Sequence, residues 1–276
     1  MVSDIGYRTT EPPPKALVTG ASAGIGRAFA TSLAAAGYSV TAVARRQDAL
    51  DDLLAQLGNG HDHLVADLAD PAGLAATAKL LHTTDYRLLV NNAGTAAPGD
   101  FSATPLESAF TTLDLNCRAM ITLAHAFLEG AEPGSALVNV SSTLGHTPKP
   151  GMAVYSATKA FVTAFSESLW HEQKSRGVHV TALCPGITLT ESQTAQGIPA
   201  WLTQSPEQVV DRARKALSDK AGPVVLTSRT NRLTTGALRL LPRRVSLALL
   251  ADRDPAGVDT ITPPGHPGHQ PQTLQT

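Results

Sequence analysis

Along the central part of the chain, short apolar runs alternate with longer segments whose apolar residues recur every three or four positions. The short runs have the length of buried β-strands, and the longer segments have the period of amphipathic helices. The predicted strands span residues 16–20, 38–44, 63–66, 87–91, 135–141, 178–184 and 223–227. The predicted helices span residues 25–36, 48–57, 72–81, 106–129, 153–174 and 206–217. This alternation predicts an α/β fold with one mainly parallel, seven-stranded sheet and helices on both of its faces.

The two ends of the chain differ in composition from this alternating region. Residues 1–14 are polar and contain a proline run, and residues 254–276 are rich in proline, glycine and polar residues. Such segments rarely join a packed core, so we expect a flexible N-terminal tail, one domain over residues 15–253 and a disordered C-terminal tail. Neither a secretory signal nor an apolar run long enough for a spanning helix is visible, which favours a cytoplasmic location.

Composition argues against several classes of function. The formal net charge is -1 and aromatic residues make up only 4%, which is unlike a nucleic-acid-binding surface. The two cysteines, Cys117 and Cys184, lie far apart and provide neither metal-ligand spacing nor a disulfide framework. We therefore expect no nucleic-acid partner and no bound metal.

A glycine-rich segment, TGASAGIG (19–26), follows the first predicted strand and opens a helix. Glycines at this place let the backbone approach a pyrophosphate, and the helix N-terminus supplies free N–H groups. The spacing departs from the commonest dinucleotide fingerprint, and the alternative is a tight turn without a ligand. The candidate cofactor contacts here are Gly20, Ser22, Ala23, Gly24, Ile25 and Gly26.

Arg45 and Arg46 follow the second strand, where an acidic residue would bind the ribose 2′-hydroxyl of NAD. A guanidinium suits the 2′-phosphate of NADP instead. The alternative is a solvated pair, although cations oppose the dipole at the start of a helix. Asp67 and Leu68 follow the third strand, and Asp67 either accepts a hydrogen bond from adenine or caps the next segment.

Small and polar residues also follow the fourth and sixth strands. Asn92, Ala93 and Gly94 either line a narrow cofactor groove or form an ordinary turn. After the sixth strand, proline and glycine turn the chain, and two threonines are candidates to hydrogen-bond a carboxamide such as that of nicotinamide. These residues are Pro185, Gly186, Thr188 and Thr190.

The sequence YSATK places Tyr155 and Lys159 four residues apart on a predicted helix, so their side chains share one face. The pKa of free tyrosine is about 10, and a neighbouring ammonium is expected to lower it toward the range of an acid–base catalyst. Ser142, at the end of the fifth strand, can hydrogen-bond the same substrate oxygen. The alternative is a surface tyrosine beside a solvated lysine.

Together these segments resemble the short-chain dehydrogenase/reductase family. TGASAGIG, NNAG, YSATK and PGITLT occur in the family's order, and the resemblance covers residues 15–227. It implies a single, doubly wound domain of the Rossmann type. It also implies a catalytic tetrad of Asn116, Ser142, Tyr155 and Lys159.

The resemblance implies a role for each of these residues. Tyr155 would be the acid–base, and Ser142 would hold the substrate carbonyl, so both contact the substrate. Lys159 would bind the nicotinamide ribose and lower the pKa of Tyr155. Asn116 would hold a water that links Lys159 to solvent.

The resemblance also bears on cofactor and partners. Arg45 stands where NADP-preferring members have a basic residue, and Asp67 would contact adenine. Ala23 departs from members with a second basic residue there, so the preference for NADP(H) over NAD(H) depends mainly on Arg45. Family members are usually dimers or tetramers through the two long helices, here predicted at 106–129 and 153–174.

The resulting hypothesis is an NADP(H)-dependent oxidoreductase that transfers a hydride between nicotinamide and the carbonyl or secondary alcohol of a small molecule. The alternative is a non-catalytic NADP(H)-binding regulator or scaffold of the same fold.

Two regions beside the expected substrate site stay open. Residues 191–204 contain Ile198, Trp201 and Leu202, and they form either an apolar lid or a packed surface helix. Opposite them, His146 and Met152 are candidates for substrate contact.

Residues 229–250 carry five arginines and no acidic residue, with leucines at helical spacing on both sides of Pro242. Our first interpretation is a helix pair that packs its leucines on the domain or at a subunit contact. The alternative is a basic amphipathic stretch that lies on an anionic membrane surface.

Overall fold

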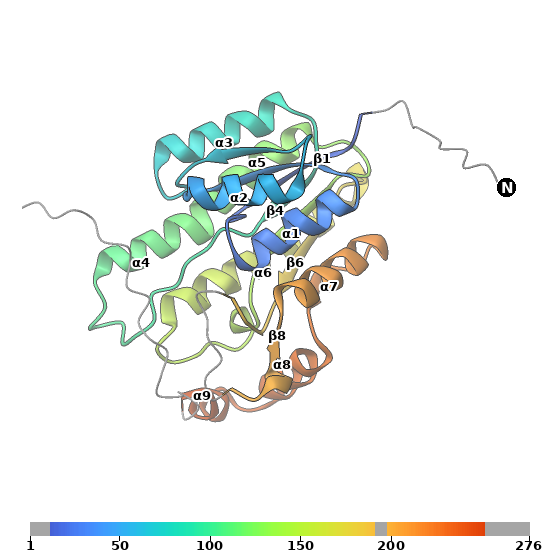
Figure 1. Ribbon diagram of the computed structural model, residues 1–276. Coiled ribbons are helices and arrows are strands. Elements are labelled where there is room, and N and C mark those ends of the chain that lie inside the picture. Colours follow the sequence, from blue (N-terminus) through green and yellow to red (C-terminus); the bar gives the residue numbers. More distant parts are fainter. Residues whose placement is uncertain (1–11, 191–197, 252–276) are drawn as a thin grey trace, which may run out of the picture.

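The computed structural model describes residues 12–190 and 198–251, which form an α/β architecture (Figure 1). At its centre is a seven-stranded sheet in which neighbouring strands are parallel. The strands, in spatial order, are β3 (Asp62–Val65), β2 (Ser39–Ala44), β1 (Lys15–Thr19), β4 (Tyr86–Asn91), β5 (Ala136–Val140), β6 (His179–Cys184) and β9 (Val224–Leu226). The predicted fold is confirmed, and each predicted strand overlaps an observed one.

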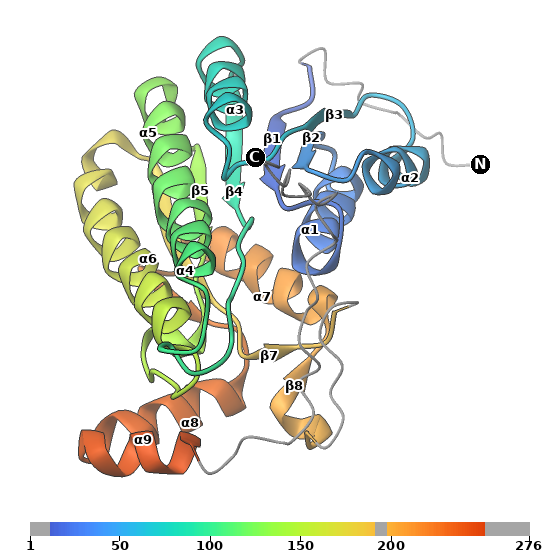
Figure 2. The ribbon, with the colours of Figure 1, turned by 90° about the vertical axis from the view of Figure 1, so that its left-hand side faces the viewer.

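Helices cover both faces of this sheet (Figure 2). One face carries α1 (Gly24–Ala35), α2 (Gln47–Leu57) and α7 (Pro206–Ser218). The other face carries α3 (Pro71–Thr83), α5 (Met120–Gly130) and α6 (Ala153–Glu172). The neighbouring residues Leu17 and Val18 of β1 point into opposite cores, as a strand buried on both faces requires.

The order of the strands reverses between β1 and β4. β1 pairs with β2 on one side and with β4 on the other. The chain therefore adds β2 and β3 on one side of β1, and then returns to add β4 and the later strands on the other side. The connections that leave β1 and β4 therefore lead to opposite faces of the sheet. Such a reversal opens a crevice at the carboxyl edge of the strands, where α/β sheets bind ligands.

The helix predicted over residues 106–129 is not regular. It consists of α4 (Leu106–Leu113), the π-helix η1 (Asp114–Ala119) and α5. The wider π turn accommodates an extra residue and changes the direction in which side chains point. Asn116 lies in this turn and is buried. Periodicity predicted the extent of this helical region, which is confirmed, but it did not predict the π turn at η1.

Two short strands that the sequence did not predict form a separate two-stranded sheet. β7 (Ile187–Thr188) pairs in parallel with β8 (Thr203–Gln204), which follows the 3-10 helix η4 (Ala200–Leu202). Residues 191–197 of the expected lid lie outside the described residues. In the described part, residues 198–204 contain only the three-residue 3-10 helix η4 and the strand β8, not a longer surface helix.

The C-terminal helices α8 (Arg229–Leu240) and α9 (Arg243–Ala251) follow β9 and are separated near Pro242, as predicted. They lie together at one end of the molecule (Figure 2). Within residues 12–190 and 198–251, every helix is too short or too polar to cross a bilayer. The expected tails fall almost wholly outside the described residues and stay predictions.

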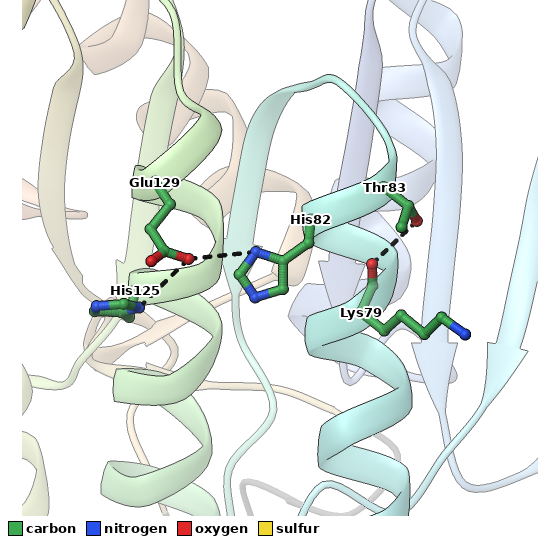
Figure 3. Close-up of polar contacts among 5 residues, drawn as sticks. All are labelled: Lys79, His82, Thr83, His125 and Glu129. Carbon is green, nitrogen blue, oxygen red and sulfur yellow. Dashed lines mark hydrogen bonds and ion pairs between the residues drawn. The ribbon is translucent and has the colours of Figure 1, made fainter.

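At the outer surface of the α3–α5 layer, Glu129 contacts two histidines (Figure 3). Its carboxylate lies 3.3 Å from Nδ1 of His82 on α3 and 3.8 Å from Nδ1 of His125 on α5. The contact therefore spans the two helices. All three side chains are exposed to solvent, so it adds little to stability.

Candidate active site

The loops that follow β1 and β4 are joined by hydrogen bonds at the strand reversal. Thr19 Oγ1 accepts from the backbone N–H groups of Asn92, at 2.9 Å, and Ala93, at 3.0 Å. The Asn92 side chain donates to the Thr19 carbonyl at 2.9 Å. The predicted cofactor segments 19–26 and 92–94 therefore form one continuous surface at the carboxyl edge.

The glycine-rich loop depends on glycine at specific positions. Gly20 and Gly24 have φ angles of +65° and +53°, which side-chain-bearing residues rarely adopt. A Cβ at Gly24 would lie 2.9 Å from Cγ2 of Thr190, and a Cβ at Gly26 would collide with the Gly20 carbonyl. The loop is thus tightly folded against its neighbours.

The N-terminus of α1 is free of competing side chains. Its N-cap residue, Ala23, makes no side-chain cap, and the first turn has no acidic residue. The N–H groups of this turn therefore keep their capacity to bind an anion, and the dipole favours negative charge there. The site fits the pyrophosphate of a dinucleotide. The Ile25 side chain packs against the apolar core, so only its backbone is available for that purpose.

The two arginines after β2 lie beside this loop. Arg46 Nη2 donates to Ser22 Oγ at 3.2 Å, which brings the β1 and β2 loops together. Arg45 Nη1 lies 3.7 Å from Asp67 Oδ2, and the Arg45 side chain is 69% exposed. Both side chains are exposed, so the alternative of a solvated pair stays open. Two guanidinium groups and a hydroxyl here match the chemistry of a phosphate-binding site.

Asp67 performs a structural role in addition to its contact with Arg45. Its Oδ1 accepts from the Ala69 backbone N–H at 2.9 Å, which stabilises the turn before α3. The cap of α3 itself is Asp70, whose carboxylate accepts from two N–H groups. Leu68 is buried in the core, so its side chain is not exposed to a ligand.

The Tyr155–Lys159 pair of α6 points to the end of β5. The Tyr155 hydroxyl is hydrogen-bonded to the side chain of Ser142, which follows β5. Lys159 Nζ donates to the Val140 carbonyl at 2.8 Å and lies 5.6 Å from the centre of the Tyr155 ring. Lys159 is buried, so the alternative of a solvated surface lysine is wrong.

Burial governs the ionisation of both groups. Desolvation lowers the pKa of Lys159 to about 8. Desolvation also raises the pKa of Tyr155, and the Ser142 hydrogen bond offsets that rise only in part. The expected lowering of the Tyr155 pKa by Lys159 is therefore not found: the contribution that lowers this pKa comes from Ser142, and burial of the phenol exceeds it.

Asn116 lies behind this pair. Its Nδ2 donates to the Thr95 carbonyl at 2.9 Å and to Thr158 Oγ1 at 3.0 Å, and its Oδ1 accepts from the Thr95 N–H at 2.9 Å. A Cβ on Gly94 would lie 3.1 Å from Asn116 Oδ1 and 3.4 Å from Lys159 Nζ. The predicted tetrad is thus gathered at one place, beside the 92–94 loop.

The segment after β6 continues this surface toward α1. Pro185 accepts from the Thr143 N–H at 2.9 Å, next to Ser142. Thr188 Oγ1 bonds the Gly186 carbonyl at 3.2 Å, and Thr190 reaches Gly24. The predicted cofactor segments after β1, β4 and β6 therefore lie together at one edge of the sheet.

Sequence reasoning missed two supporting residues of this segment. Asn231 of α8 donates to Oε1 of Gln204 at 2.9 Å, and it packs so closely on Gly186 that a Cβ there would collide with it. Both residues are buried. They come from outside every motif, so no local signal pointed to them.

Of the expected substrate contacts, His146 has a buried Nε2 without a hydrogen-bond partner among the described residues. Burial, with Arg239 nearby, lowers the pKa of His146. Met152 is partly buried at the N-terminus of α6, and Trp201 is 64% exposed. Their contact with a substrate stays a prediction.

A comparison with known protein families matches residues 14–199 to the short chain dehydrogenases. The chain belongs to the short-chain dehydrogenase family. Its members are oxidoreductases, and the recognition made from the motifs is confirmed. The matched region ends before α7, so α8 and α9 lie beyond it.

Relatives of this short-chain dehydrogenase act on different substrates. It is 39% identical to sulfoacetaldehyde reductase of Chromohalobacter salexigens over 182 residues, which cover 63% of this chain and 72% of the relative. It is 30% identical in sequence to the solved bulky-bulky ketone specific alcohol dehydrogenase from Comamonas testosteroni (TM-score 0.72; 84% of this chain and 96% of that chain). It is 32% identical to a short-chain dehydrogenase from Sphingobium yanoikuyae in complex with NADPH (TM-score 0.71; 83% and 96%).

Proposed function

We propose that this short-chain dehydrogenase interconverts a small-molecule carbonyl compound and the corresponding secondary alcohol, with NADP(H) as cofactor. The observation that carries the proposal is the Ser142–Tyr155 hydrogen bond beside the buried Lys159. A bound NADPH would supply the hydride to the carbonyl carbon, and a bound NADP+ would accept it from the alcohol in the reverse direction. Side chains of this protein would transfer the proton and orient the carbonyl oxygen.

Tyr155 is the acid–base of the proposal. Its pKa is raised by burial, so the phenol holds its proton at neutral pH and can donate it to a carbonyl oxygen. Ser142 already hydrogen-bonds the Tyr155 hydroxyl and can orient the same oxygen. Lys159 places a positive charge near the phenol and stabilises the phenolate that proton donation leaves behind. Asn116 positions the loop beside Lys159, where a relay water is proposed.

The preference for NADP(H) rests on Arg45, Arg46 and Ser22. Arg46 is held at Ser22 by a hydrogen bond, and Arg45 is exposed on the same side. These groups suit a 2′-phosphate, whereas the 2′-hydroxyl of NAD would call for a carboxylate. The relative from Sphingobium yanoikuyae, which was solved with NADPH, supports the same choice.

A homodimer or homotetramer is part of the proposal. Large apolar side chains are exposed on α4 and α6, the helices expected at the subunit contact. They are Leu106, Phe110, Leu113 and Phe161. Covering such side chains is favourable by about 25 cal/mol per Å².

Cys117 and Cys184 are both free thiols, which suits a reducing compartment such as the cytoplasm.

The test is NADPH consumption with a panel of aldehydes and ketones. We expect turnover that Tyr155→Phe lowers by about a hundredfold or more, because the proton donor is lost. Tyr38→Phe, at a tyrosine outside the site, is the control and keeps full activity. NADPH binding without turnover on any carbonyl would overturn the catalytic proposal and favour the regulator.

A further inference from the structure

The helices α8 and α9 turn polar residues inward and apolar residues outward. The buried residues of the pair are Asn231, Thr235 and Ser246. Leu233 and Leu240 of α8 are 74% and 88% exposed. The other exposed large apolar residues of this region are Leu241, Val245, Leu247 and Leu249. These residues are therefore not packed on the domain, which contradicts that half of the first interpretation, whereas its other half, a subunit contact, stays a prediction.

The exposed apolar residues of α8 form a continuous stripe. Leu233, Ala237 and Leu240 follow one another at helical intervals of four and three residues, so they share one face. Each of them is exposed. A contiguous apolar face of this kind marks an interaction surface.

Positive charge surrounds this stripe. Residues 229–251 contain five arginines and no acidic residue, and none of these arginines forms an ion pair within the described residues. Next to the stripe, Arg229 and Arg232 of α8, Ser228 at its N-cap and Arg212 of α7 line a hollow of about 330 Å³. An anionic group can be held there by several guanidinium groups at once. This surface thus combines exposed leucines with arginines whose positive charges are not neutralised by neighbouring carboxylates.

We propose that α8 and α9 dock on an anionic lipid surface, with the leucines in the apolar boundary and the arginines at the headgroup phosphates. Basic amphipathic helices bind membranes in this way, lying in the interface plane. A second copy of this chain is a poorer partner for this surface. A two-fold contact would bring the five arginines of each copy together, and their like charges would repel. The proposal does not depend on the proposed catalytic function.

Co-sedimentation of the full chain with vesicles tests this proposal. We expect the protein to pellet with phosphatidylcholine vesicles that contain phosphatidylglycerol and to stay in the supernatant with pure phosphatidylcholine. Raising the salt concentration should release it, because salt screens the contribution of the arginines.

Two double variants separate the apolar contribution to vesicle binding from the electrostatic contribution. Leu233→Asp with Leu240→Asp should abolish measurable binding, and the fold should be kept because both side chains are exposed. Arg239→Gln with Arg243→Gln should weaken partitioning roughly thirtyfold, since a basic residue near an anionic surface contributes about fivefold. Lys15→Gln with Lys79→Gln removes the same charge far from α8 and should bind like the unaltered protein. Equal thermal unfolding midpoints would establish that all variants are folded.

Three outcomes would overturn the proposal. The protein could stay in the supernatant with both kinds of vesicle, which would favour a protein partner. It could lose binding equally in the Lys15/Lys79 control, which would reveal a non-specific charge effect. Finally, it could form a larger oligomer that Leu233→Asp with Leu240→Asp dissociates, without vesicle binding, which would make the stripe a subunit contact.

Discussion

The ammonium group of Lys159 donates a 2.8 Å hydrogen bond to the carbonyl of Val140, the last residue of β5. The lysine is thereby anchored to the sheet itself, and burial lowers its pKa to about 8. An anchored, partly desolvated cation beside Tyr155 is the feature on which acid–base chemistry in this site depends.

The lowered pKa of Lys159 makes stability depend on pH. The folded pKa is about 8 and the ordinary value is 10.5, so the unfolded state binds the proton more tightly. The resulting destabilisation is present in full below pH 8 and is relieved as the pH rises from about 8 to 10.5, by at most about 3 kcal/mol.

Lys159→Met should remove this pH dependence. We expect the stability of the unaltered protein, relative to Lys159→Met, to increase between neutral and alkaline pH in chemical denaturation. Tyr155, whose raised pKa acts in the opposite direction, is common to both proteins and cancels, whereas Cys184 is coupled to Lys159 and contributes to the difference. A constant difference between the two proteins would contradict a shifted Lys159.

Ser142→Ala should affect the ionisation of Tyr155. The Ser142 hydrogen bond lowers the Tyr155 pKa, so its loss should shift phenolate formation to higher pH. Ultraviolet absorbance of the phenolate measures this, with Tyr155→Phe as the blank. We also expect turnover to fall by about tenfold to a hundredfold, and Ser142→Thr to restore both properties in part. An unchanged Tyr155 titration would exclude this role of the hydroxyl.

Arg45→Ala with Arg46→Ala tests the cofactor preference. A charge-assisted hydrogen bond contributes about 1.5–3 kcal/mol, so the affinity for NADPH should fall at least tenfold. The affinity for NADH, which lacks the 2′-phosphate, should stay nearly constant. Arg118→Ala, on η1 and paired with Asp114, is the control for general loss of charge. If the ratio of the two affinities does not change, the basis for naming NADP(H) is lost.

Gly24→Ala tests the glycine-rich loop against a matched glycine. Both Gly24 and Gly37 have positive φ angles, but only at Gly24 would a Cβ meet another residue, Thr190. Each substitution should cost about 1–2 kcal/mol of stability through backbone strain. Only Gly24→Ala should also weaken NADPH binding, as isothermal titration would show. Equal binding by both variants would mean that this part of the loop does not contact the cofactor.

Many features of this protein follow from short stretches of sequence. The strands are apolar on both faces, so apolar runs such as 16–20 and 87–91 predicted them. Asp70–Pro71 marked the start of α3, and Ser205–Pro206 marked the start of α7, through local capping. Tyr155 and Lys159 share a face because four residues make about one helical turn.

Other features required the tertiary structure, because they depend on residues far apart in the chain. The Arg46–Ser22 contact spans two loops, and Asn116, in the π-helix η1, hydrogen-bonds Thr95, 21 residues away in the sequence. The burial that sets the ionisation of Lys159 comes from the packing of α6 on the sheet. The leucines of α8 have the same helical spacing as those of a buried helix. Periodicity shows which residues share a face, whereas only packing decides whether that face is covered, and here Leu233 and Leu240 are left exposed.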